Sequence, residues 1–493
     1  MPTLSNIRRC HRAVPLALLL GLPCAGAADI TATWNGSIGN WTDAARWSGA
    51  VVPDNSGANL YDAGINSGRA SLTGNITVNQ FALGGGLVDG AFTLTALEGL
   101  QWTGGEIRGL GTLALGATGI STVSGPAPHL LNARTLSNAG TLIFGSGIIT
   151  GSNGATINNL AGATFTVLGE AAFFADFANP AWTFNNAGTF IARATAGTGF
   201  TSMDAVFNNT GSVGVERIGS ATQTLSLAGG GTHSGSWDLQ EGTTVELGGL
   251  TTLQAGTVFA GAGTVIVAGD VSVSGSISAG NLVVALGELS VGENFVGVTG
   301  TAIQTGGTIR LGSGTFQVGF EGGTLLSDGG ILTGSGILDG SLDTQGTVAP
   351  GNGAGTLAIN GNATFGDDAR LEIEIGGLNA GSFDLLTTFG AKLGGELDVR
   401  LLHGFLPAPD ASFTILTSFF LIDGTFLNAP VDGDRFDVNG IGSFQVNYFE
   451  TSVLLSNYIP EPSSPALLAA ALAIPGMRRW RPKARCEVRR CRD

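Results

Sequence analysis

The most regular feature of the sequence is a phrase in which an apolar residue precedes Asn, a small residue, Gly and a second apolar run. It occurs at Leu136–Leu142, Ile157–Phe165, Phe184–Phe190 and Phe207–Val213. Its glycines, Gly140, Gly162, Gly188 and Gly211, are 22, 26 and 23 residues apart. A repeat of this length predicts stacked units that each complete one turn of a coil.

The local pattern indicates that the coil is built from strands. Residues 271–274 and 371–375 alternate apolar and polar side chains, as a strand with one buried face does. Asn and Gly tolerate positive φ, so we expect the Asn-x-Gly phrase to form corners between strands. Three short strands and three corners fit one repeat, which predicts a parallel β-helix with turns about 4.8 Å apart. Roughly 250 residues would form about ten or eleven turns, and aligned Asn residues would form a hydrogen-bonded ladder. A Gly-rich β-sandwich is the alternative.

Three tryptophans near the start of the repetitive region predict a cap. Trp34, Trp41 and Trp47 precede the first repeats. Because the end of a solenoid exposes unpaired strand edges, we expect these rings to cover the open end of the core. The alternative role for Trp34, Trp41 and Trp47 is stacking on carbohydrate.

Composition narrows the fold class further. Gly occupies 81 of the 493 positions, which excludes a helix-dominated protein because Gly weakens helices. All four cysteines, Cys10, Cys24, Cys486 and Cys491, lie in the terminal segments. Residues 29–459, which we call the body, therefore hold no disulfide and no thiolate metal site.

The body is strongly acidic. It contains 11 basic and 34 acidic residues, a net charge of −23, and Lys392 is its only lysine. Such a body repels nucleic acid, so we expect no nucleic-acid partner. The excess carboxylates suggest weak divalent-cation binding that would bridge the chain to acidic polysaccharide.

The first 28 residues have the order of a secretory signal peptide. A basic start precedes the apolar run 13–22 and a small-residue stretch that ends at Ala27 and Ala28, where we expect cleavage. Cys24 offers a lipoprotein alternative, but Pro23 stands where such signals have a small residue.

The far end carries a second three-part pattern. Pro460, Glu461 and Pro462 precede the apolar run 466–474, and arginines follow at Arg478, Arg479 and Arg481. This order resembles the PEP-CTERM sorting signal of Gram-negative bacteria. The resemblance implies an exosortase-type sorting enzyme as partner, membrane contact through the C-terminal segment, and export to the outer envelope, cell surface or extracellular matrix. A degenerate amphipathic tail is the alternative.

The stretch Gly346–Leu357 resembles the phrase that closes the β-helical passengers of autotransporter-like adhesins. The phrases Phe383–Leu386, Leu393–Leu397, Phe413–Leu416 and Gly424–Phe426 follow in the order of such passengers. The resemblance implies a β-helical body that ends in a β cap. The sorting tail stands where an autotransporter has its translocator barrel.

Some polysaccharide hydrolases and lyases are also β-helices, and they use clustered carboxylates or a basic residue beside metal-binding Asp residues. Asp367 and Asp368 lie near Arg370, and 432–437 is rich in Asp, but a turn and a polar hairpin explain them. His129, His233 and His403 have no metal-binding spacing. The sequence therefore predicts no catalytic residue, no metal site and no cofactor.

These observations predict an all-β parallel β-helix, or solenoid, with N- and C-terminal β caps and targeting helices at both ends. The expected parts are a signal peptide (1–28), an N-terminal cap with the first rungs (29–110), the repeats (111–365), a C-terminal cap (366–458) and a sorting signal (459–493). The expected function is that of a secreted, non-enzymatic surface or matrix protein associated with biofilm exopolysaccharide.

Two alternatives stay open. A polysaccharide-acting enzyme needs a groove with three or more convergent Asp, Glu, Arg or Lys side chains. An ice- or surface-binding protein needs Thr-x-Thr in register on successive turns, and Thr93-Leu94-Thr95 occurs singly.

Overall fold

The computed structural model describes residues 30–461, except 58, 177–181, 320–321 and 439. The predicted signal peptide, the apolar run 466–474 and the expected targeting helices lie outside the described residues. The chain divides into two compact units, here called unit 1 (to Gly269) and unit 2 (from Asp270). The described residues form β-solenoid turns, about 15 in total, and contain no α-helix.

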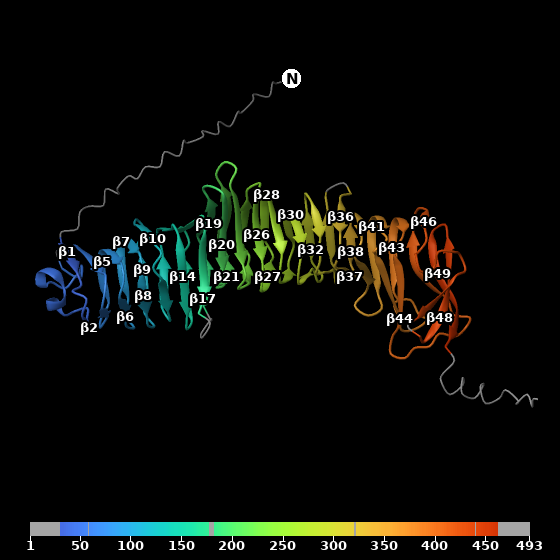
Figure 1. Ribbon diagram of the computed structural model, residues 1–493, viewed down its shortest axis with the longest axis horizontal. Coiled ribbons are helices and arrows are strands. Elements are labelled where there is room, and N and C mark those ends of the chain that lie inside the picture. The colour runs from blue at the N-terminus through green and yellow to red at the C-terminus, as the bar shows by residue number, and fades with distance from the viewer. Residues whose placement is uncertain (1–29, 58, 177–181, 320–321, 439, 462–493) are drawn as a thin grey trace, which may run out of the picture. The chain divides into compact units, whose positions relative to one another are not determined.

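In unit 1, strands three apart in the chain pair in parallel, so one turn of coil has three strands, as predicted (Figure 1). One column of stacked strands contains β7 (Leu94–Trp102), β10 (Ile120–Val123), β13 (Thr141–Phe144), β16 (Thr164–Leu168), β19 (Thr189–Ala194), β22 (Ser212–Arg217), β25 (Ser236–Leu239) and β28 (Val258–Val267). The second contains β8 (Gly105–Arg108), β11 (His129–Asn132), β14 (Gly147–Ser152), β17 (Ala171–Ala175), β20 (Thr198–Met203), β23 (Thr222–Leu227) and β26 (Thr243–Leu247). The third contains β9 (Thr112–Leu115), β12 (Thr135–Asn138), β15 (Ala155–Asn159), β18 (Trp182–Asn186), β21 (Val206–Asn209), β24 (Gly231–His233) and β27 (Leu250–Gln254).

Parallel stacking begins at the first described residue. The opening strands are β1 (Ile30–Thr33), β2 (Ile38–Asn40), β3 (Tyr61–Ile65), β4 (Arg69–Ser71), β5 (Ile76–Leu83) and β6 (Leu87–Asp89). They pair in two series that continue into β7 and β8. Two single 3₁₀ turns, η1 (Ala44–Arg46) and η2 (Ser48–Ala50), follow β2. Of the tryptophans expected to form a cap, Trp34 directly follows β1, and Trp41 and Trp47 lie between β2 and β3.

Unit 2 also consists of parallel columns. One contains β29 (Asp270–Ser274), β31 (Glu288–Ser290), β34 (Thr308–Arg310), β37 (Ile331–Gly334), β40 (Thr347–Pro350), β42 (Arg370–Ile375) and β44 (Glu396–Leu401). The other faces use β30 (Ile277–Val284), β32 (Phe295–Val298), β33 (Ala302–Gln304), β35 (Thr315–Val318), β36 (Thr324–Ser327), β38 (Ile337–Asp339), β39 (Ser341–Thr344), β41 (Thr356–Phe365) and β43 (Leu385–Leu393).

Among the described strands, antiparallel ladders, as distinct from isolated bridges, appear only near the end of unit 2. The strands β45 (Phe413–Ser418) and β46 (Ile422–Gly424) still stack in parallel on β43. The strands β47 (Arg435–Val438), β48 (Gly442–Phe449) and β49 (Ser452–Pro460) then close the unit, with β49 antiparallel to β45 and β48. The parallel coil thus continues past residue 366, where the cap was expected to begin.

The core lies inside each coil, because most strands bury alternate side chains. β15, for example, buries Ala155, Ile157 and Asn159 and leaves the residues between them half-buried. Phenylalanine rings stack along the axis of unit 1: Phe165 lies 5.8 Å from Phe190, its register partner one turn on. Close packing of such rings along the coil axis stabilises the turns against one another.

The predicted Asn ladder is confirmed. Asn138, Asn159, Asn186 and Asn209 are register partners on successive turns, and each is at most 1% exposed. The Nδ2 of each donates to the Oδ1 of the next, over 2.9, 2.7 and 2.8 Å. Asn138 Nδ2 also lies 3.2 Å from the backbone oxygen of Gly140, so the amide closes the corner that follows it. The ladder satisfies polar groups that would otherwise be buried without a partner.

A second ladder runs beside the first on the outer surface. Asn185 Nδ2 donates to Asn158 Oδ1 over 2.9 Å, and Asn208 Nδ2 donates to Asn185 Oδ1 over 3.0 Å. Here the donors point toward earlier turns, opposite to the inner ladder. These three amides are half-buried.

The glycines of the repeat occupy their corners for a different reason from the expected one. Gly140, Ala163, Gly188 and Gly211 are equivalent, because the oxygen of each of the first three accepts a bond from the next turn. Gly162, counted as the second repeat glycine, lies one residue before that position. The prediction that aligned the four glycines was therefore wrong by one residue at this turn.

Space, rather than positive φ, requires these glycines. A Cβ on Gly188 would lie 2.3 Å from the Ala163 oxygen, and one on Gly211 would lie 2.1 Å from the Gly188 oxygen. Neither residue has positive φ, whereas Gly162 does, at 83°. The corners are tight because neighbouring turns approach through their backbones.

A buried arginine supports the first turns of unit 1. Arg134 is 1% exposed, and its guanidinium donates to the backbone oxygens of Gly90, Phe92 and Thr112 over 2.7, 2.8 and 2.9 Å. Burial lowers its pKa to about 10, so it remains charged at neutral pH. The guanidinium ties together carbonyl groups from successive turns.

Candidate functional site

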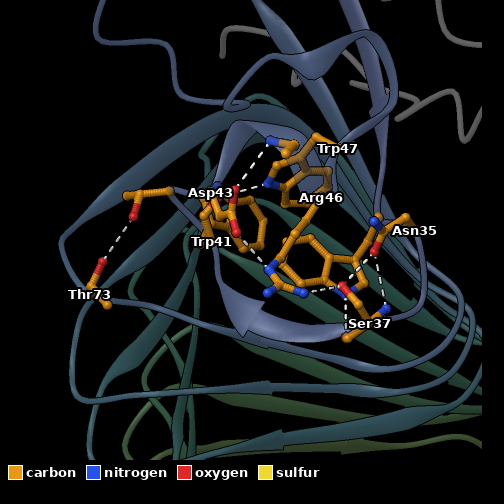
Figure 2. A network of polar contacts seen from close by, with 10 residues as sticks. Asn35, Ser37, Trp41, Asp43, Arg46, Trp47 and Thr73 are labelled. Atoms are coloured by element: carbon orange, nitrogen blue, oxygen red, sulfur yellow. Dashed lines mark hydrogen bonds and ion pairs between the residues drawn. The ribbon is translucent and has the colours of Figure 1, made fainter.

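Trp34, Trp41 and Trp47 form a buried cluster, and Figure 2 shows Trp41 and Trp47 within it. Trp34, Trp41 and Trp47 are 4%, 0% and 3% exposed. The ring of Trp47 lies 5.1 Å from that of Trp34 and 4.7 Å from that of Trp41, and Trp41 contacts Phe81 of the core. The rings therefore pack on one another and on Phe81 inside unit 1. Stacking on a sugar would require this cluster to open.

Polar contacts hold the tryptophan cluster in place (Figure 2). Trp47 Nε1 donates to the Trp41 oxygen over 2.7 Å. Arg46 Nε donates to Asp43 Oδ2 over 2.7 Å, and its Nη1 donates to Ser37 Oγ over 2.7 Å. These partners all lie between Ser37 and Trp47, so the network fixes the conformation of this segment.

Most residues of the predicted targeting signals lie outside the described residues. This holds for Ala27, Ala28, Pro462, Arg478, Arg479 and Arg481. Pro460 is the last residue of β49, and the backbone N–H of Glu461 donates to the Ile441 oxygen over 2.9 Å. Within residues 30–461 no helix has the length and apolar character to cross a bilayer.

The acidic pairs weighed as catalytic or metal sites form turns. Asp367 and Asp368 lie in the turn before β42, and Arg370 pairs instead with Glu396 over 3.3 Å. In the segment 432–437, Asp437 Oδ2 accepts from Gly440 N over 2.9 Å at the β47–β48 hairpin. Among the described residues, no group of three or more His, Cys, Asp or Glu is placed to hold a metal.

The histidines lie in unrelated surroundings. His129 is buried against Trp102, with its ring nitrogens near backbone oxygens. His403 lies in a turn with a φ of 52°. His233 continues the column of the Asn ladder as the register partner of Asn209, and neither of its ring nitrogens has a hydrogen-bond partner. Burial lowers the pKa of His233 to about 4.

Threonines align on one outer face of unit 1. Thr112, Thr135, Thr156 and Thr183 are register partners on successive turns. The outward residues two positions later in the same strands are Ala, Ser, Asn and Asn rather than Thr. This face therefore has one Thr column and lacks the Thr-x-Thr array that an ice-binding role requires.

Unit 2 brings charged side chains together in a groove. This charged cavity has a volume of about 330 Å³ and extends over the column of β34, β37, β40, β42 and β44. Its charged residues are Arg310, Glu372, Glu374, Asp384 and Arg400. The strand register places outward-facing residues of successive turns next to one another. Glu374 of β42 and Arg400 of β44 are register partners in this way.

Ion pairs hold the two arginines of the charged cavity. Arg310 Nη2 lies 3.0 Å from Glu288 Oε2, and its Nη1 donates to Asn352 Oδ1 over 3.3 Å. Arg400 Nη2 lies 2.9 Å from Glu372 Oε1 and 3.4 Å from Asp398 Oδ2. About a third to a half of each arginine side chain remains exposed to solvent.

Asp384 forms the inner wall of the cavity and is 1% exposed. Its carboxylate accepts from Gly355 N over 2.8 Å and from Glu374 N over 2.7 Å, and so fixes the loop after β40. Burial raises its pKa to about 7 against the lowering effect of these two bonds, and the neighbouring Glu374 carboxylate raises it further. Asp384 thus links the two phrases, Gly346–Leu357 and Phe383–Leu386, on which the adhesin resemblance rests.

The charged cavity offers guanidinium and amide donors beside carboxylate acceptors, a mixture suited to hydroxyl-rich ligands. Sequence reasoning did not identify it. The alternation of 371–375 placed Glu372 and Glu374 on one face, but Arg310 and Arg400 come from other turns. Their meeting depends on register, which the sequence pattern does not set.

No known protein-family model and no curated protein matches this chain.

Proposed function

We propose that this chain is an exported, non-enzymatic β-solenoid protein of the cell surface or extracellular matrix that binds extracellular polysaccharide. The observation that carries the proposal is the charged cavity of unit 2, where donors and acceptors lie on an exposed face of a rigid coil. Hydroxyl groups of sugars both donate and accept hydrogen bonds, so such a surface suits them.

The scaffold supports the same proposal. The body has no cysteines, and hydrogen-bonded Asn ladders and an apolar core stabilise it. It therefore needs no disulfide outside the cell. Its sequence is flanked by a secretory pattern and by the Pro460-Glu461-Pro462 pattern, from which we infer export, sorting by an exosortase-type enzyme and membrane contact through the C-terminal segment.

Polysaccharide binding is tested by screening the purified chain on a bacterial glycan array. A double variant, Asn352→Ala with Glu374→Gln, removes an amide and a carboxylate from the cavity lining. Its binding to polysaccharide should be weaker than that of the wild type. Glu396→Gln is the matched control, since Glu396 lies in the same column outside the cavity lining. Equal binding by all three proteins would contradict this assignment.

Sorting is tested separately by deleting residues 462–493. The deletion keeps β49 intact, because that strand ends at Pro460. We expect a folded product that no longer associates with the envelope. Unchanged envelope association would contradict the sorting signal.

A second candidate function, polysaccharide cleavage, is favoured by one observation. The cavity meets the requirement for convergent charged side chains, because Arg310, Glu372, Glu374 and Arg400 all line it. Release of reducing ends from a bound polymer, lost in Glu374→Gln, would establish it. Binding without release would favour the non-enzymatic role.

A further inference from the structure

Unit 2 exposes a cluster of aromatic rings on another face. Phe389 of β43 and Phe419 and Phe420 of the turn between β45 and β46 are 46%, 73% and 54% exposed. We call these three residues the aromatic platform. Contiguous apolar surface of this kind on a soluble protein marks an interaction site.

The rings of the aromatic platform are held in mutual contact. Phe389 and Phe419 stack at 5.4 Å with an interplanar angle of 8°, and Phe420 meets both rings edge-on at 4.8 and 5.0 Å. Backbone bonds from Phe419 N to the Thr388 oxygen (3.1 Å) and from Phe420 N to the Phe389 oxygen (2.8 Å) fix the turn on the coil. The platform is therefore preorganised, which lowers the entropic cost of binding.

A groove of about 380 Å³ adjoins the platform. Its wall includes Phe420 and Leu421, and its polar groups are Asn362, Thr364 and Lys392. Gly390 lines the same groove, where a Cβ would lie 2.6 Å from Asn362 Oδ1. The groove therefore combines apolar surface with an amide, a hydroxyl and an ammonium group.

The local charge indicates a neutral ligand. Lys392 is the only lysine of the body, and its register partner on β46 is Asp423. Asp343 lies in the same outward column, as the register partner of Thr364, so the column carries one positive and two negative charges and no positive excess that would attract a polyanion. A polyanion gains little attraction here and is repelled by the rest of the body.

We propose that the aromatic platform and its groove bind a strand of neutral hexose polysaccharide. The inference rests on the proposed function and names the class of glycan. The phenyl faces stack on the apolar C–H faces of successive sugar rings, and Asn362, Thr364 and Lys392 bond to their hydroxyls. Because Phe389 and Phe419 each cover one face of the other, at most one face of each ring is open to a sugar, and an extended chain such as a β-linked glucan presents ring faces that can pack there.

The test uses the full exported chain and measures binding to soluble mixed-linkage β-glucan by affinity electrophoresis and calorimetry. Replacing Phe419 and Phe420 together with Ala should weaken binding about tenfold, because two stacking contacts are lost. Leu286→Ala is the matched control, since Leu286 is 64% exposed in unit 2 outside the groove and should bind like the wild type. Binding should change little between low and high salt, as expected for an uncharged ligand.

The outcomes separate this inference from the proposed function. Binding to alginate but not to β-glucan, or equal binding by the phenylalanine variant, overturns this inference and leaves the proposed function standing. Binding to no polysaccharide overturns both. If the variant abolishes self-association in sedimentation without changing glucan binding, the platform is a contact between two copies of the chain and the inference is wrong.

Discussion

Asn159 donates its Nδ2–H to the Oδ1 of Asn186 over 2.7 Å, although the two residues are 27 positions apart in the chain. Both amides are 1% exposed inside unit 1. An amide buried without a partner costs about 1–3 kcal/mol, so Asn138, Asn159 and Asn186 are each stabilised by the Asn at the same position on the next turn. The ladder therefore specifies register as well as stabilising the coil.

Removing one member of the inner ladder should destabilise unit 1 markedly. Asn186→Ala removes the Oδ1 that accepts from Asn159 Nδ2 and the Nδ2 that donates to Asn209 Oδ1. We expect the free energy of unfolding to fall by about 2 kcal/mol. Asn185→Ala removes a half-buried amide from the outer ladder and should cost under about 1 kcal/mol, since water replaces its bonds. Chemical denaturation followed by circular dichroism measures both. Equal losses would contradict a structural role for the inner ladder.

The corner glycines should resist substitution for steric reasons. Gly211→Ala places a Cβ 2.1 Å from the Gly188 oxygen, so the turns must separate, and we expect a loss of about 2 kcal/mol or more. Gly74→Ala is the control, because a Cβ there meets nothing within 4 Å and its φ is not positive. Melting temperatures of both variants measure the difference. A neutral Gly211→Ala would show that the corner is less tight than described.

Unit 1 should lose stability on mild acidification. The pKa of buried His233 falls from 6.5 to about 4 on folding, so the unfolded chain binds a proton first as the pH drops. The stability that the neutral His233 ring gives to the folded state is fully present above pH 6.5. It is lost as the pH falls toward 4, and the free energy of unfolding drops by about 3 kcal/mol at most. His233→Phe, which removes the titrating ring, should flatten the pH profile of unfolding in this window. His403→Asn, in an exposed turn, should leave the profile unchanged.

Unit 2 should show the opposite dependence at Asp384. Burial raises the pKa of this carboxyl from 3.8 to about 7, so folding favours its protonated form. The stability that protonated Asp384 gives to the folded state is fully present below about pH 4 and is lost as the pH rises through about 7. Thermal unfolding of unit 2 should therefore occur at a higher temperature at pH 5 than at pH 8. The control Asp410→Asn should keep this difference, and its persistence in Asp384→Asn would contradict the assignment.

The sequence predicted the parts of the fold that local pattern determines. Alternation indicated strands, and the repeated Asn indicated aligned corners, because stacked amides can bond to one another from turn to turn. Turn length varies, however, from 21 residues between Asn138 and Asn159 to 27 between Asn159 and Asn186. Loops absorb this difference, so counting residues between glycines misplaced Gly162.

The candidate sites could not be predicted in the same way. Arg310 and Arg400 line one cavity with the carboxylates of β42 only because four register steps bring their strands into one column. Phe389 and Phe419 are 30 residues apart, and nothing local to either residue indicates that their rings stack. Sites on a solenoid form between turns, whereas sequence patterns report on single strands.

The central claim, that this coil binds extracellular polysaccharide, is tested most directly by calorimetry of the purified chain with a panel of neutral and acidic bacterial polysaccharides. We predict saturable binding to at least one polymer, weakened by Asn352→Ala with Glu374→Gln and retained in Glu396→Gln. A folded chain that binds no polymer in the panel would contradict the account.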